Sequence, residues 1–178
     1  FELAKRRMPE QTHPDFADGI RMLEEATIEL RKSAYNLMPE VLMTQGLATA
    51  VETYCQKISG QNNTQISFQS LGNPPATGSK FEMPIYRIIQ ELIHNIIKHA
   101  KAKYALVQLN FNDGGALSVT VEDDGIGLQA GVPDQSSGMG LSNLKERVND
   151  IGGRLDIQSS PDAGTSIYME FAPIHENQ

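Results

Sequence analysis

A chain of 178 residues can bury one good hydrophobic core, with room for a short appendage. Hydrophobic residues at 39% and charged residues at 21% are ordinary for a globular domain, which argues against a disordered, collagen-like or membrane-bundle protein. The net charge of −7 makes a broad basic face for nucleic acid unfavourable, so we expect no nucleic-acid partner and at most a local phosphate site.

Cysteine content and hydropathy bear on the compartment. Cys55 is the single cysteine, which rules out an intrachain disulfide and favours a cytoplasmic location. No apolar run approaches the ~20 residues that cross a bilayer, so no direct membrane contact by this chain is expected. The start at Phe1, in a charged stretch without a signal peptide, suggests a cytoplasmic fragment whose parent protein could be anchored elsewhere.

The N-terminal segment, residues 1–37, is predicted to be helical. A short helix over 1–7 and a proline-containing loop over 8–14 precede one long helix, whose apolar positions alternate in steps of four and three: Phe16, Ile20, Leu23, Thr27, Leu30, Ala34 and Leu37. This spacing fits the seam of a helical bundle, but it also fits an amphipathic helix on its own domain. Pro39 ends the helix, which places a domain boundary near 38–46 and a second domain over 38–178.

Helices and strands mix in the second domain. We expect helices over 47–58, from about Pro84 in a first turn to Ala100, and over 141–151. Strands are predicted over 65–71, 104–111, 117–121, 154–158 and 166–171, the second and third joined by a hairpin at 112–115. This order predicts an α+β fold, a two-layer sandwich of a mixed β-sheet with helices on one face; a doubly wound parallel sheet fits it less well.

The helix that ends at Ala100 carries the first chemical signal. Its apolar face holds Ile85, Ile89 and their neighbours, and Glu91, Asn95 and Lys98 form a polar stripe opposite, with His94 and His99 at the edges. A solvated helix face would look the same. Asn95 favours a functional interpretation, because asparagine is a poor mid-helix residue and serves better as an oxygen ligand or a hydrogen-bond donor.

Two glycine-containing motifs follow. Asp124, Gly125 and Gly127 come after a predicted strand, where the carboxylate can accept from an exocyclic amine such as that of adenine; an ordinary Asp-Gly turn is the alternative. Gly138, Gly140 and Leu141 open a helix, whose free amides suit a phosphate, although a plain loop-to-helix junction has the same pattern. The Gly- and Ser-rich loop over 128–137 could close over bound phosphates.

Together these motifs resemble the GHKL superfamily of ATPases and kinases over residues 38–178. QELIHNIIKHA (90–100) is similar to its N box, DDGIG (123–127) to its G1 box and GMGL (138–141) to its G2 box. The stretches GMGLSNLKERV and NLMPEVLMTQGLATAV are most similar to two-component sensor histidine kinases of the nitrate-sensor and DesK-like type.

The resemblance implies a site for ATP and Mg²⁺. It makes Asn95 the magnesium ligand and a catalytic residue, with Glu91 at the position where the ATPases of the superfamily keep a general base. The nucleotide-binding residues that it implies are Asn95, Lys98 and His99 near phosphate or ribose, Asp124 and Thr165 at adenine, Gly125 and Gly127 around the adenine pocket, and Gly138, Gly140 and Leu141 at the lid hinge.

The implied function is transfer of the γ-phosphoryl group to a histidine, for relay to a response regulator, by a protein that self-associates through its helical bundle. One departure is that no His followed by an acidic residue stands on a predicted helix, and His13 precedes Pro14 in a loop. We therefore expect the acceptor on a helix upstream of this chain, which alone would not phosphorylate itself. A GHKL-type ATPase, a related serine kinase and a nucleotide-binding signalling module are the alternatives.

Overall fold

The computed structural model describes Met22 and residues 40–59, 63–74, 79–112, 115–128 and 141–172. The chain divides into two units, Phe1–Met38 and Pro39–Gln178. The predicted helical segment over 1–37, Met22 apart, and the predicted Gly- and Ser-rich loop over 128–137, Leu128 apart, lie outside the described residues.

Nine elements make up the described part of the second unit. In chain order they are α3 (Glu40–Ser59), β1 (Gln65–Leu71), α4 (Ser79–Asn95), the π-helical turn η1 (Ile96–Ala100), β2 (Tyr104–Phe111), β3 (Leu117–Asp123), α5 (Leu141–Asp150), β4 (Gly153–Ser159) and β5 (Thr165–Phe171). Each strand predicted from the sequence is present, with ends that differ by two residues at most.

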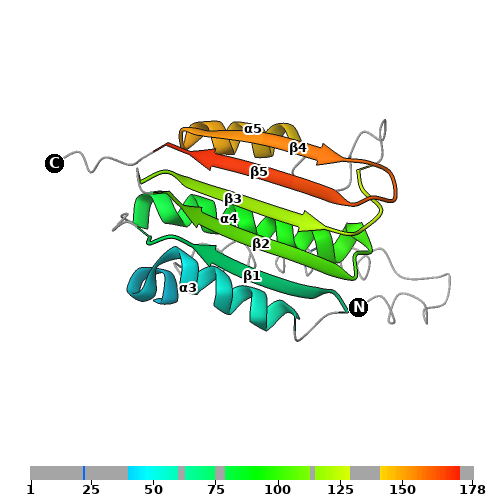
Figure 1. The fold of residues 1–178 in the computed structure, drawn as a ribbon, viewed down its shortest axis with the longest axis horizontal. Coiled ribbons are helices and arrows are strands. Elements are labelled where there is room, and N and C mark those ends of the chain that lie inside the picture. The colour runs from blue at the N-terminus through cyan, green and yellow to red at the C-terminus, as the bar shows by residue number, and fades with distance from the viewer. Residues whose placement is uncertain are drawn as a thin grey trace. The chain divides into compact units, whose positions relative to one another are not determined.

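The five strands form one mixed sheet in the order β1-β2-β3-β5-β4. β1 and β2 are parallel, and the other neighbours are antiparallel, which confirms the predicted hairpin between β2 and β3. α4 and α5 lie behind the sheet in Figure 1, and α3 contacts both β1 and α4. The arrangement confirms the predicted α+β sandwich.

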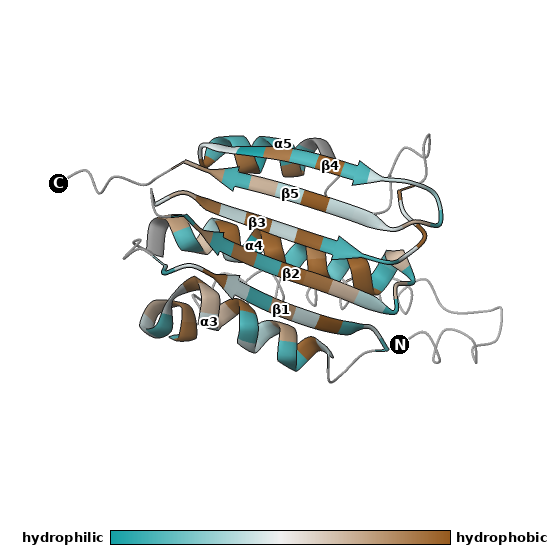
Figure 2. Cartoon of the chain, viewed as in Figure 1, coloured by the Kyte–Doolittle hydropathy of each residue, from teal (hydrophilic) through white to brown (hydrophobic). Residues whose placement is uncertain are grey.

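The core lies between the sheet and its helices. Alternate side chains of β2 and β3 are buried, and so is the predicted apolar face of α4, where Ile85, Ile89 and Ile93 are fully buried. Brown and teal bands along these elements follow the same alternation in Figure 2. Phe171 closes the core at the end of β5, edge-to-face with Phe81 at a centroid distance of 5.8 Å.

Two helix boundaries differ from the expectation. α4 begins at Ser79, so Pro84 lies inside the helix and not in its first turn, and it cannot donate a hydrogen bond to the Lys80 carbonyl. α3 begins at Glu40, directly after Pro39, and the expected break falls inside it at Gly46, with φ 77° and ψ 178°. The predicted segment from Leu47 is therefore the second half of a kinked helix.

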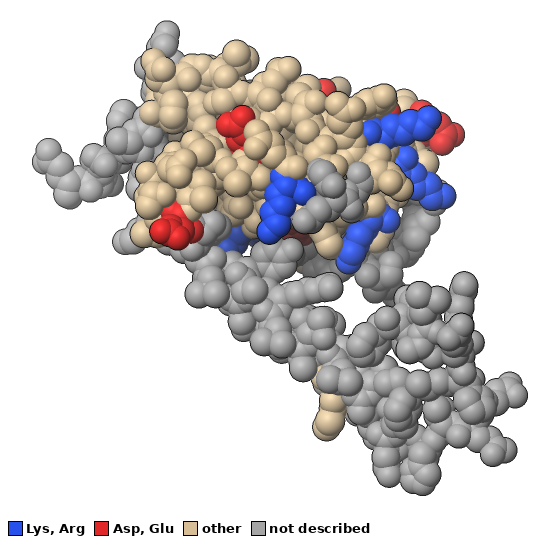
Figure 3. Space-filling model, turned by 90° about the horizontal axis from the view of Figure 1, so that it is seen from below, with Lys and Arg blue, Asp and Glu red and all other residues tan. Residues whose placement is uncertain are grey.

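Charged side chains of both signs occur on the described surface. Figure 3 shows Lys and Arg together with Asp and Glu on one face of the molecule, and neither sign covers the part of this face that the structure describes. None of the helices among the described residues is long and apolar enough to cross a membrane.

Candidate functional site

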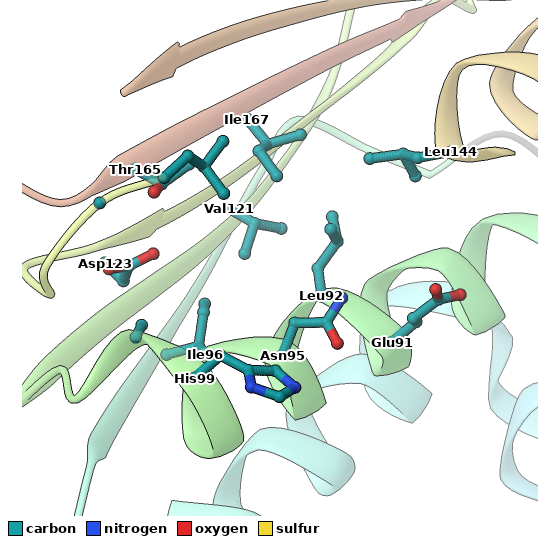
Figure 4. Close-up of a pocket in the computed structure, with 13 residues that line it drawn as sticks. Glu91, Leu92, Asn95, Ile96, His99, Val121, Asp123, Leu144, Thr165 and Ile167 are labelled. Carbon is teal, nitrogen blue, oxygen red and sulfur yellow. The ribbon is translucent and has the colours of Figure 1, made fainter. Parts of the chain in front are cut away.

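A cavity opens between α4 and the sheet, at the ends of β3 and β5 (Figure 4). Helix α5 adds Leu144 to its wall. The residues that line it are Glu91, Leu92, Asn95, Ile96, His99, Ala100, Val121, Asp123, Gly127, Leu128, Leu144, Thr165 and Ile167. Most of the wall is apolar, with polar groups at a few points, which is typical of a small-molecule site.

Asp123 supplies the carboxylate at one end of this cavity. It is the last residue of β3, two positions after the buried Val121, so strand alternation turns both side chains toward α4. Its Oδ1 accepts the Gly125 N–H at 2.8 Å. Burial raises the pKa of the Asp123 carboxyl, the Gly125 N–H lowers it, and the neighbouring Asp124 raises it further.

The structure does not place Asp124, the amine acceptor assigned from the sequence, in the lining of this cavity. Asp124 is exposed and is absent from the cavity lining, because it follows the end of the strand and alternation points it the other way. Its Oδ1 instead accepts the backbone N–H groups of Lys103 and Tyr104, each at 2.8 Å. Asp124 therefore fixes the backbone at the start of β2 through these two hydrogen bonds. The alternating pattern Val119, Val121, Asp123 could have identified Asp123 as the aspartate that faces the cavity.

Gly125 and Gly127, which follow Asp124, each lie so close to a backbone carbonyl of another segment that a side chain would not fit. A Cβ on Gly125 would lie 2.2 Å from the Ala100 carbonyl oxygen, where the neighbouring Ile126 N–H donates at 2.9 Å. Gly127 has φ +70°, and a Cβ there would lie 2.2 Å from the Ser160 carbonyl oxygen. Gly127 lines the cavity and Gly125 does not, so Gly125 acts by joining the turn to the end of η1.

Thr165, assigned to the site from the sequence, is the register partner of Asp123 on the neighbouring strand β5, and both residues line the cavity (Figure 4). Thr165 Oγ1 is 3.0 Å from the hydroxyl of Ser159. The Ser159 hydroxyl can donate to the Gly164 carbonyl at 3.0 Å and accepts the Leu128 N–H at 2.8 Å. Either hydroxyl can donate in the contact between Thr165 and Ser159, and a hydroxyl can both donate and accept, so Thr165 offers the cavity a group of either kind.

The polar residues of α4 and η1 enter the cavity at intervals of four: Glu91, Asn95 and His99. Lys98, which the sequence placed on this stripe, is exposed and outside the lining. The π-turn explains the difference, because its i→i+5 hydrogen bonds wind more widely than an α-helix, and each residue turns through a smaller angle. The fourth residue after Asn95 then stays on the cavity side while the third turns away.

Glu91 has a partner on α5 that the sequence did not indicate. Arg147 Nη1 donates to Glu91 Oε2, and the two residues are 56 positions apart. The side chains are 22% exposed for Glu91 and 31% for Arg147, so the pair is partly shielded from water. It connects the helix after the predicted phosphate loop to the helix that carries Asn95.

The predicted phosphate-binding motif lies mostly outside the described residues. Gly138 and Gly140 lie outside the described residues, and Leu141 is described only as the first backbone position of α5. Among the described residues, no three His, Cys, Asp or Glu side chains come together as a metal site. Burial raises the pKa of the Cys55 thiol to about 12, which leaves no reactive thiolate there at neutral pH.

Comparisons with known proteins identify the relatives of this chain. Residues 81–175 match the family described as histidine kinase-, DNA gyrase B-, and HSP90-like ATPase. A sensor-like histidine kinase from Chloroflexus aurantiacus is 32% identical over 174 residues, 94% of this chain and 29% of the relative. The sensor histidine kinase MctS from Rhizobium johnstonii is 32% identical over 152 residues, 84% of this chain and 32% of the relative. The chain thus spans about a third of the length of these relatives.

Solved structures show the same fold. The histidine kinase domain of a blue-light activated histidine kinase from Erythrobacter litoralis superposes with a TM-score of 0.56 at 21% identity, covering 70% of this chain and 64% of that one. The histidine kinase AdeS from Acinetobacter baumannii gives 0.60 at 13% identity, covering 97% and 90%.

Proposed function

Because the chain belongs to the histidine kinase-, DNA gyrase B- and HSP90-like ATPase family, we propose that its cavity binds Mg-ATP and that it is the catalytic domain of a sensor histidine kinase. The observation that carries the proposal is the distribution of polar groups in a mostly apolar cavity, with the Asp123 carboxylate and the Thr165 hydroxyl at one end and the Asn95 amide farther along α4 (Figure 4).

The Asp123 end of the cavity suits adenine. Asp123 Oδ1 is occupied by Gly125, so the second carboxylate oxygen is available for the exocyclic amine of the base. Thr165, the register partner of Asp123 on β5, presents a hydroxyl at the same end of the cavity. Apolar side chains of Val121, Ile96 and Ile167 supply flat contact surface between these two groups. A guanine base in the same position would place a carbonyl oxygen against the Asp123 carboxylate, where two acceptors would face each other.

The other end suits the triphosphate. Asn95 and His99 line the cavity on the α4 side, and an asparagine oxygen is a ligand that Mg²⁺ accepts, together with phosphate oxygens and water. When bound, Mg²⁺ would neutralise phosphate charge. We keep Asn95 as the proposed metal ligand and His99 as the proposed phosphate or ribose contact. Lys98, Gly138 and Gly140 remain assignments from the sequence.

The proposed reaction moves one phosphoryl group. A ring nitrogen of the acceptor histidine forms a bond to Pγ as the bond from Pγ to the bridging oxygen breaks, and ADP leaves. The acceptor belongs to an upstream helix, and self-association through the helical bundle would bring it to the cavity. A response regulator would then take the phosphoryl group. Because the proposed reaction consumes ATP, we propose that this domain works in the cytoplasm, where ATP is supplied.

Titration calorimetry with ATP and Mg²⁺ tests the site. In Asp123→Asn the amide oxygen takes the Gly125 N–H and the amide NH₂ faces the amine of adenine, so we expect at least a tenfold loss of affinity. Asp124→Asn is the matched control and should bind ATP within threefold of the wild type, because its carboxylate holds backbone amides outside the cavity. Equal losses in both variants would refute the Asp123 assignment.

A second measurement tests the kinase activity. A longer chain that carries the preceding helix is incubated with γ-labelled ATP and Mg²⁺, and the labelled protein is treated with acid and with base. An acid-labile, base-stable phosphoprotein that is absent in Asp123→Asn is the expected result. Free phosphate without labelled protein would favour the ATPase alternative, and no turnover would favour the signalling module.

A further inference from the structure

Glu91 lies at the phosphate end of the proposed nucleotide site. Asp123 and Thr165 stand at one end of the cavity and Glu91 at the other, beside Leu144 of α5 (Figure 4). With the adenine amine on Asp123, the triphosphate extends toward Glu91. This step rests on the proposed function, since it takes the direction of the nucleotide from the adenine site.

A carboxylate in that place can act as a base for water. In hydrolysis the water oxygen forms a bond to Pγ, one water proton passes to the base, and the bond from Pγ to the bridging oxygen breaks, so that ADP and phosphate leave. The base must have an oxygen within about 2.6–3.2 Å of the water that it deprotonates. Position alone would therefore allow Glu91 to make this chain an ATPase.

The structure shows the Glu91 carboxylate engaged elsewhere. Its Oε2 accepts from Arg147 Nη1 on α5, across the gap between the two helices. A charge-assisted bond to a planar guanidinium fixes the direction of the carboxylate more firmly than a bond to a neutral donor. With 22% of its side chain exposed, Glu91 also has limited freedom to find another rotamer.

We propose that Arg147 is a positioning residue that holds Glu91 away from the water next to Pγ and so suppresses ATP hydrolysis. The γ-phosphoryl group is then kept for transfer to a protein nitrogen. Breaking the pair should convert a slow hydrolase into a faster one without any new chemical group, because Glu91 is already in the cavity wall.

The test is a double-mutant cycle on phosphate release by this chain with saturating Mg-ATP. Arg147→Met should release free phosphate at least tenfold faster than the wild type, since a positioned general base contributes about 10²–10⁴-fold. Adding Glu91→Gln to Arg147→Met should return the rate to within threefold of the wild type. Arg147→Lys keeps a cation near Glu91 and should keep hydrolysis slow.

A surface variant and a binding measurement make the outcomes separable. Arg154→Met removes one positive charge from an exposed position of β4 and should leave phosphate release unchanged. Calorimetry with ATP is run on each variant. Failure of the wild type to bind ATP would defeat the proposed function itself.

Three results, each with ATP binding intact in the wild type, would overturn the role of Arg147. The first is an Arg147→Met variant that binds ATP and releases phosphate at the wild-type rate. The second is a faster phosphate release in Arg147→Met that persists when Glu91→Gln is added. The third is loss of ATP binding in Arg147→Met with its circular dichroism spectrum unchanged, which would make Arg147 a phosphate ligand. If Arg147→Met does not fold, Arg147→Gln takes its place in the cycle.

Discussion

At the scale of single residues, Asp123 is placed where it lowers the stability of the fold. Its carboxyl is half-buried, and desolvation raises its pKa above the usual range. The Asp123 carboxylate accepts the Gly125 N–H through Oδ1, and its two oxygens together retain acceptor capacity for a further donor. Groups destabilised in this way are concentrated at functional sites, which supports Asp123 as the ligand of the base.

The raised pKa of Asp123 predicts how stability depends on pH. Below about pH 3.9, the ordinary aspartate value, the carboxyl is protonated in both the folded and the unfolded state and carries no penalty. As the pH rises through the higher pKa of the folded state, the native protein loses stability, because it must bury the charged form. We therefore expect the Tm of Asp123→Asn to exceed that of the wild type at pH 7 and the difference to shrink toward pH 4. Thermal unfolding at both pH values measures it, and a difference independent of pH would contradict it.

At the scale of elements, the transition from α4 to η1 decides which side chains reach the cavity. An α-helix would keep residues three and four positions after Asn95 at similar distances from it, on either side. The π-turn favours the fourth, His99, over the third, Lys98. Rare π-turns occur often at functional sites, and here the turn ends where Gly125 and Ile126 meet Ala100.

This geometry predicts an order of effects on nucleotide binding. His99→Ala should weaken ATP binding about tenfold, the value of one hydrogen bond to a charged phosphate. Lys98→Ala should change the dissociation constant less than threefold, because an exposed lysine contributes a screened charge. Titration calorimetry at 0.15 M salt compares the two. A larger loss of ATP affinity in Lys98→Ala than in His99→Ala would contradict this prediction. It would indicate that Lys98 contacts the nucleotide, as the polar stripe of an unbroken α-helix predicts.

At the scale of the whole molecule, one core joins the sheet to its helices. Phe171 is fully buried at the end of β5, against Phe81 of α4 and against Gly153 of β4, where a Cβ would lie 2.5 Å from Phe171 Cε1. Phe171 therefore contacts both α4 and the edge strand β4, and its close packing holds the helix against this part of the sheet.

Phe171→Ala should lower the free energy of unfolding by about 3–5 kcal/mol, through lost burial and the cavity that remains. Tyr168→Ala is the matched control on the same strand, where the ring is 40% exposed, and it should lower the free energy by less than about 1.5 kcal/mol. Urea unfolding measures both. Similar losses would mean that the core does not extend to this end of β5.

The sequence by itself determined the local structure and the chemistry of the motifs. Alternation over residues 65–71 and 104–111 predicted the strands, and the glycine-rich hairpin predicted the antiparallel pairing of β2 and β3, because both signals act between near neighbours. The polar stripe on the helix indicated Glu91 and Asn95, and the family resemblance implied Thr165; all three line the cavity that the structure shows.

Only the tertiary structure decided which member of each adjacent pair faces the cavity and which distant residues meet there. Asp123 faces the cavity in place of Asp124, since the strand continues to Asp123, and His99 faces it in place of Lys98, since the helix widens after Asn95. Arg147 meets Glu91, 56 residues away in the chain, because the fold brings α5 within side-chain reach of α4. Such contacts depend on how the helices pack on the sheet, and the spacing of residues along the chain does not determine this packing.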